Sequence, residues 1–68
     1  MHCKVIVEKV RNGFVATVRD ETDSQIAEFA AVTREGAISN AKYDALDFLA
    51  GEAEPTTFEI VDLTESQL

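Results

Sequence analysis

The sequence predicts an α+β domain with the order β-β-β-α-β, in which one helix packs on one face of an antiparallel sheet. Two apolar runs, 3–10 and 14–18, flank Asn12-Gly13, a helical pattern follows Thr33, and a further strand-like run covers 56–63. A chain of 68 residues leaves room for a single small domain. We assign that domain to residues 1–63 and a short polar tail to residues 64–68.

The first two strands are expected to form a hairpin around Asn12-Gly13. This dipeptide favours a type I′ turn, which requires positive φ at both central residues. A two-residue loop there pairs Arg11 with Phe14, and paired residues share a face of the sheet. One face is then continuously apolar and is expected to form the core: Cys3, Val5, Val7, Phe14, Ala16 and Val18.

A third strand is expected over residues 25–32, after a polar turn at 20–24. Its alternation is weaker than that of the hairpin, so two assignments stay open. The favoured set of inward side chains is Ala27, Phe29 and Ala31. The opposite set is Ile26, Ala30 and Val32.

The helix is expected over about 34–50, because Thr33 is a good N-cap and Gly51 a natural C-terminal stop. Gly36 stands where a capping box has Glu or Gln, so only half of that box is present. The apolar helical residues fall in a sector about 120° wide. They are Ala37, Ile38, Ala41, Ala45, Phe48 and Leu49, with Leu46 at the edge. In the fourth strand, over 56–63, Phe58 and Ile60 share one face, and Val61 and Leu63 share the other.

The charge balance argues against nucleic acid as a direct partner. The formal net charge is −7, and the 6 basic residues are dispersed along the chain rather than clustered as phosphate binding requires. Basic protein partners are favoured instead through electrostatic steering. No apolar run approaches membrane-spanning length, and no signal-peptide pattern is present. With one cysteine, which cannot form an intrachain disulfide, the sequence favours the reducing cytoplasm.

The residue inventory predicts a protein that is not an enzyme and that uses no metal or cofactor. His2 and Cys3 are adjacent on a strand, which sends their side chains to opposite faces. The acidic turn residues Asp20, Glu21 and Asp23 favour a solvated turn first, a partner-binding patch second and a metal site last, because calcium-loop spacing is missing. Tyr43 is either a packed edge or a binding hot spot. We take these three acidic residues and Tyr43 as the candidate partner-binding set.

The reverse face of the sheet is the candidate oligomer interface. One helix covers one face only, and the other face is expected to expose an apolar patch of roughly a few hundred Å², the size at which patches mark interfaces. Edge strands add backbone groups that a second copy would satisfy. We therefore predict a homodimer, formed face to face or through strand edges. The residues assigned to the contact are Ile6, Val10, Val15, Val61 and Leu63.

Three segments resemble the HicB antitoxin family, over about residues 3–50. They are the hairpin strings 5–9 and 12–16, with the family's Gly, aromatic, variable residue and Ala; the helix start 33–37; and its continuation at 40–42 and 45–46. The chain departs from the family at 19–23, where members carry a Pro-x-Leu-Pro-Gly-Cys segment, and at Gly36, which replaces a Glu.

The resemblance implies a partial ribonuclease-H-like fold without that fold's nuclease carboxylates. It also implies an antitoxin that occupies a small basic mRNA-cleaving toxin of the HicA type and masks its catalytic surface. Because the chain ends after the fourth strand, we expect it to lack the family's DNA-binding C-terminal module. The alternative is a stand-alone oligomerising interaction domain that has lost toxin binding, and a small enzyme is the least favoured interpretation.

Overall fold

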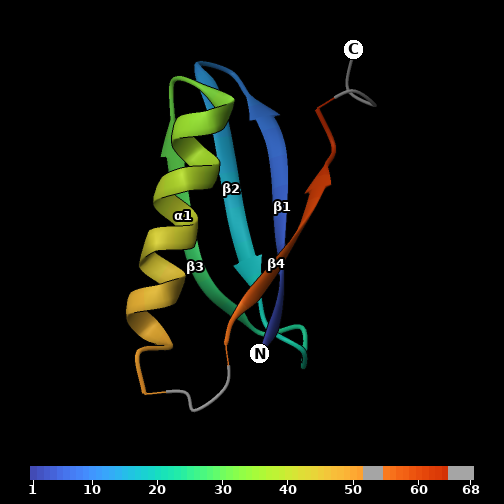
Figure 1. Ribbon diagram of the computed structural model, residues 1–68. Coiled ribbons are helices and arrows are strands. Elements are labelled where there is room, and N and C mark those ends of the chain that lie inside the picture. The colour runs from blue at the N-terminus through green and yellow to red at the C-terminus, as the bar shows by residue number, and fades with distance from the viewer. Residues whose placement is uncertain (52–54, 65–68) are drawn as a thin grey trace.

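The computed structural model describes residues 1–51 and 55–64 and shows a four-stranded sheet with one helix packed on it (Figure 1). The α+β class and the order β-β-β-α-β are confirmed. The elements are β1 (His2–Val10), β2 (Gly13–Arg19), β3 (Gln25–Ala31), α1 (Arg34–Phe48) and β4 (Thr57–Asp62).

The sheet is mixed rather than wholly antiparallel. Its strand order is β3-β2-β1-β4; β2 is antiparallel to both of its neighbours, whereas β4 runs parallel to β1. β3 and β4 are therefore the two edge strands, and α1 carries the chain from one edge to the other. The parallel pairing follows from this connection, since a helix that runs back along the sheet returns the next strand in the direction of the previous one.

The hairpin turn lies one residue earlier than the sequence suggested. Val10 pairs with Gly13, so Arg11 and Asn12 form the loop, and the predicted pairing of Arg11 with Phe14 is wrong. Asn12 does not adopt positive φ, which excludes the expected type I′ turn. The change moves the partner of each β1 residue by two positions, and a shift of two leaves every side chain on its predicted face.

Gly13 has a different role from the one predicted, because it allows a close approach by β3. A Cβ built on Gly13 would lie 2.3 Å from the Ala31 carbonyl oxygen, far inside van der Waals contact. The glycine therefore serves the packing of β2 against the end of β3 rather than the turn itself.

The core lies between α1 and the predicted apolar face of the hairpin. Cys3, Val5, Val7, Ala16 and Val18 have no exposed surface, and Phe14 packs against them while half-buried. From α1, the buried side chains are Ala37, Ala41, Ala45 and Leu49.

A β-bulge settles the open question about β3. Val18 pairs with Ala27 but Arg19 pairs with Gln25, so Ile26 is the extra residue. Ala27 and Ala31 share the core face with Val18, as the favoured assignment had it, and the bulge lets Ile26 pack on the core as well. Phe29 lies on the same face opposite Ala16, but it stays exposed at the sheet edge.

The start of α1 matches the prediction, with a local reason for Gly36. The Thr33 hydroxyl accepts a hydrogen bond of 3.0 Å from the Gly36 N–H. A Cβ at position 36 would lie 2.8 Å from that hydroxyl oxygen. Glycine therefore leaves the cap undisturbed where a capping box would place Glu.

The end of α1 differs from the prediction. The helix ends at Phe48 with Leu49 as its C-cap, two residues short of position 50, so Gly51 is not the residue that stops it. Phe48 was expected in the core but is 68% exposed. The last turn still packs on the core, because Ala45 is fully buried and Leu49 is only 8% exposed. Phe48 therefore lies on the side of this turn that faces solvent.

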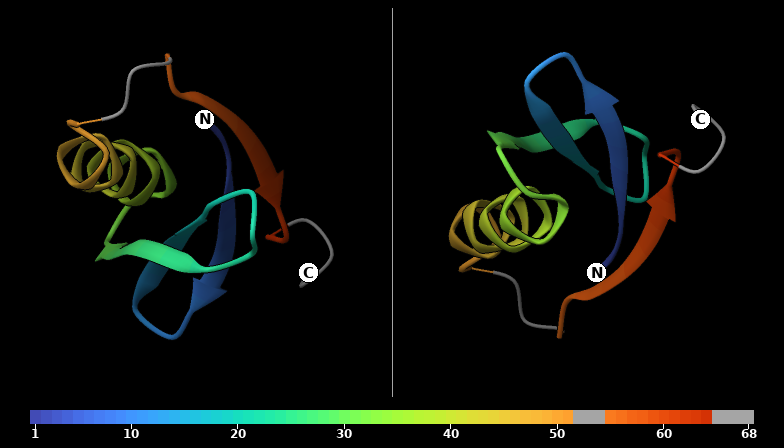
Figure 2. Two further views of the ribbon diagram at one scale, coloured as in Figure 1. Left: turned by 90° about the horizontal axis from the view of Figure 1, so that it is seen from below. Right: turned by 90° about the horizontal axis from the view of Figure 1, so that it is seen from above.

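α1 packs mainly on β3 and β2, less on β1, and leaves the inner face of β4 largely uncovered (Figure 2). Phe58 still reaches the core and is half-buried. Ile60 pairs with the fully buried Val5, yet it is 39% exposed. Thr56 and Leu63 lie outside the strand as the structure has it. Of the predicted tail, Thr64 is hydrogen-bonded to Asp62, and 65–68 fall outside the described residues.

The packing predicts different costs for two truncations in the apolar set. Val7→Ala removes two buried methyl groups and should lower the free energy of unfolding by about 1–3 kcal/mol. Phe48→Ala should cost less than about 1 kcal/mol, because most of its ring contacts solvent. Urea titration measures both, with Val32→Ala at another exposed position as the control. Equal costs for Val7→Ala and Phe48→Ala would contradict this packing.

Candidate functional site

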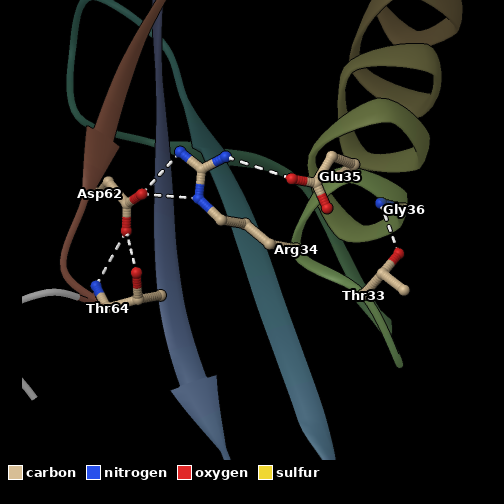
Figure 3. Close-up of polar contacts among 6 residues, drawn as sticks. All are labelled: Thr33, Arg34, Glu35, Gly36, Asp62 and Thr64. Carbon is tan, nitrogen blue, oxygen red and sulfur yellow. Dashed lines mark hydrogen bonds and ion pairs between the residues drawn. The ribbon is translucent and has the colours of Figure 1, made fainter. Parts of the chain in front are cut away.

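An ion pair joins the start of α1 to the end of β4 (Figure 3). The Nε and Nη2 atoms of Arg34 each lie 2.6 Å from Oδ2 of Asp62. The other carboxylate oxygen, Oδ1, accepts hydrogen bonds from the backbone N–H and the hydroxyl of Thr64, at 2.9 and 2.5 Å. Nη1 of Arg34 also lies 3.9 Å from Glu35. Asp62 therefore holds both the helix N-terminus and the chain that follows β4.

The same contacts explain the ionisation of Asp62. Hydrogen bonds from Thr64, together with the nearby Arg34 guanidinium, lower the pKa of the Asp62 carboxyl. The carboxylate is thus committed to holding structure rather than to exchanging protons near neutral pH.

A groove runs along the flank of α1 below this ion pair. Its first part is an open depression of about 450 Å³, and a second of about 260 Å³ continues it toward the C-terminal end of the helix. Tyr43 and Leu46 border both depressions. We call this surface the α1 groove. Its lining residues are Arg34, Glu35, Ile38, Ser39, Lys42, Tyr43, Leu46, Asp47 and Ala50.

The two cations of the α1 groove are engaged by the protein's own groups. Arg34 pairs with Asp62, and the Lys42 ammonium lies over the Phe58 ring, 5.6 Å from its centroid. Glu35, 3.9 Å from Nη1 of Arg34, and the exposed Asp47 are the acidic side chains of the lining. The groove is therefore lined by two basic and two acidic side chains.

The acidic turn between β2 and β3 is organised by its own side chains. Oδ1 of Asp20 accepts from the Thr22 N–H and hydroxyl, at 2.8 and 2.7 Å, and from the Ser24 N–H at 3.0 Å. These bonds, that from Thr22 foremost, lower the pKa of Asp20. Asp23 adopts positive φ, and its carbonyl oxygen accepts a hydrogen bond from Arg19. Asp20 is therefore a turn-forming residue.

The structure separates the four residues predicted to bind a partner. Asp20, Glu21 and Asp23 line a depression of about 420 Å³ with His2 and Lys4, and Glu21 accepts a hydrogen bond of 2.8 Å from the His2 N–H. Tyr43 lies in the α1 groove instead. In the ranges 1–51 and 55–64, no three His, Cys, Asp or Glu side chains are placed to hold a metal ion.

His2 and Cys3 face opposite sides of β1, as the sequence predicted. Cys3 is fully buried in the core, and burial raises the pKa of its thiol, which disfavours the reactive thiolate. His2 is exposed, with Nδ1 3.0 Å from the Thr57 hydroxyl and Nε2 3.6 Å from Glu59. Cys3 thus belongs to the core and His2 contacts β4, so the two side chains do not share a site.

The residues predicted for an oligomer interface lie on the reverse face or next to it. Ile6 is directly beside Val61, whereas Val15 is opposite Glu8, so a charge interrupts the apolar surface. Ile6, Val15 and Val61 are half-buried, and Val10 and Leu63 are more exposed. Their role at an interface between two copies of the chain stays a prediction.

Sequence reasoning missed most of the α1 groove. Leu46 was taken as the edge of the inner face, and Ile38 and Lys42 were not considered as surface residues. The available signal was the spacing of Tyr43 and Leu46, which places them on one stripe of the helix away from the buried alanines.

Comparison of this chain with protein-family models, with curated proteins and with solved structures found no match. The resemblance to HicB antitoxins therefore remains an expectation from short sequence segments. α1, the helix of the described residues, is neither long enough nor apolar enough to cross a membrane.

The two lowered carboxyl pKa values predict a loss of stability in acid. A carboxyl whose pKa is lower in the folded state stabilises the fold above its ordinary pKa of about 3.9. That contribution is lost as the pH falls through the folded-state pKa, when Asp20 and Asp62 become protonated. Thermal unfolding followed from neutral pH down to about pH 2 should show this loss, and Asp62→Asn should reduce it.

Asp44→Asn is the matched control, since it removes one carboxylate from the exposed face of α1 without touching either hydrogen-bond set. The Asp44→Asn variant should lose as much stability in acid as the unmodified protein does. An Asp62→Asn variant that loses as much stability in acid as the unmodified protein would contradict the assigned role of Asp62.

Proposed function

We propose that this chain is a non-enzymatic module that binds a basic protein. The observation that carries the proposal is the exposure of large apolar side chains on one helix: Tyr43 is 76% exposed, Phe48 68% and Leu46 47%. Tyr43 and Leu46 line the same groove, whereas Phe48 lies outside it, and exposed apolar side chains that lie together on a small domain are typical of an interaction site. The net charge of −7 favours a basic partner.

The uses of the chemically capable side chains support a binding role over catalysis. Cys3 is core, while Asp20 and Asp62 are hydrogen-bonded parts of a turn and of a helix–strand connection. We propose the cytoplasm as the compartment, because it keeps a free thiol reduced.

The specific form of the proposal is an antitoxin of the HicB kind. Its partner would be a small basic mRNA-cleaving toxin of the HicA type, which the module neutralises by covering the toxin's catalytic surface. The order of elements and the acidic charge are consistent with this form. The antitoxin form is more specific than protein binding alone, because it names the activity that the module suppresses.

Co-expression with a basic protein from an adjacent reading frame tests this function. The two chains should elute together in gel filtration as a complex of defined stoichiometry. Added in equal amount, the module should suppress RNA cleavage by the partner. The isolated module should not bind RNA with submicromolar affinity at physiological salt. Tight RNA binding, or the absence of any complex with a basic protein, would refute the proposal.

The alternative is a homo-oligomerising domain, and the reverse face is the observation that favours it. Ile6 and Val61 lie side by side there, with Val10 43% exposed on the same face. If a second copy covers this face, sedimentation should give twice the chain mass at micromolar concentration. Val15→Asp should then reduce the measured mass to that of one chain, because a buried unpaired charge at the interface is costly. A monomer that persists at high concentration would exclude this alternative.

A further inference from the structure

β4 is held to the domain along one side only. Its backbone pairs with β1, and none of its six residues is buried. β3 is also an edge strand without a buried residue, but α1 packs directly on it, whereas α1 leaves the inner face of β4 largely uncovered (Figure 2). Removal of β4 would therefore leave the buried side chains of β1, β2 and α1 packed on one another.

Backbone hydrogen bonds fasten β4 at its two ends. The Thr57 N–H donates to the Met1 carbonyl oxygen at 2.8 Å, and the Leu63 N–H donates to the Val7 carbonyl oxygen at 2.9 Å. Water replaces such bonds when a strand separates from its sheet, so each contributes only modestly to holding β4 in place.

The ion pair between Arg34 and Asp62 is the strongest side-chain contact between α1 and β4 (Figure 3). Two guanidinium nitrogens lie 2.6 Å from one carboxylate oxygen, and charged hydrogen bonds of this kind are about twice as strong as neutral ones. The Lys42 ammonium over the Phe58 ring adds a weaker contact across the same gap. Separation of β4 therefore has to break the ion pair first of all.

We propose that β4 separates from the sheet as one unit while the rest of the domain stays folded, and that the Arg34–Asp62 ion pair sets how often this opening occurs. Opening uncovers the outer edge of β1 together with Cys3 and Val5, which lie beside Phe58 and Ile60 on the same face of the sheet. β4 is thus a strap that controls access to the edge of β1. This opening is independent of the proposed function.

Hydrogen exchange of the whole chain in increasing concentrations of urea tests the opening. The amide protons of Thr57 and Leu63 should exchange with the same weak dependence on urea, because the separation of one strand exposes little new surface. Amide protons in the middle of α1 should exchange with a strong dependence on urea, because they require global unfolding.

The single thiol of the chain gives a second readout. Cys3 has no exposed surface while β4 is in place, so its reaction with an aryl disulfide reagent reports the opening. Asp62→Asn should raise the rate of this reaction at least about fivefold, because a neutral amide forms weaker bonds with the Arg34 guanidinium. Arg34→Gln, which changes the other member of the pair, should have the same effect.

Ala41→Gly is the matched control, since it weakens α1 at a buried position of the helix and leaves the ion pair intact. It should lower the urea midpoint of global unfolding and leave the rate of Cys3 modification without urea unchanged. Circular dichroism should show that all three variants are folded before the rates are compared.

Three results would overturn the proposal. The first is the same urea dependence of exchange for β4 and α1, because β4 would then leave only when the whole domain unfolds. The second is an unchanged rate of Cys3 modification in Asp62→Asn and Arg34→Gln. The third is an equal rise of that rate in Ala41→Gly, which would assign Cys3 modification to global unfolding.

Discussion

A single narrow helix has to cover a four-stranded sheet, and the architecture follows from that mismatch. With its side chains, a helix is about 10 Å wide, whereas strands are spaced about 4.8 Å apart, so one helix covers about two strands. Ala37, Ala41 and Ala45 let α1 pack closely on β3 and β2, which leaves the inner face of β4 open. The exposure of Ile60 beside the buried Val5 marks the boundary of the covered area.

Several ionisable side chains hold together the parts of the structure that α1 does not cover. Asp62 and Arg34 join β4 to the helix that does not lie over it, and Lys42 approaches Phe58 across the same gap. At the other end of the sheet, Asp20 closes the turn that leads into β3. The flank of α1 that carries Tyr43 and Leu46 stays exposed.

The predicted fold succeeded where local patterns are strong and failed where distant segments meet. Alternation placed Cys3, Val5 and Val7 on the core face, and Thr33 began the helix as its side-chain chemistry indicated. The turn was misplaced because Gly13 is required by the passing backbone of Ala31, a contact that the hairpin sequence does not contain. The parallel pairing of β4, likewise, depends on the path of α1 across the sheet.

By itself, the sequence determined the elements, their order, the apolar face of the hairpin and an acidic charge that favours basic partners. The periodicities of strand and helix and the identity of each side chain are sufficient for these. Only the tertiary structure decided that Phe48 is exposed, that the acidic turn and Tyr43 lie at separate sites, and that Tyr43 and Leu46 line one groove. Helical periodicity assigns a side chain to a sector. Which part of that sector the sheet covers depends on how the helix lies across the twisted strands.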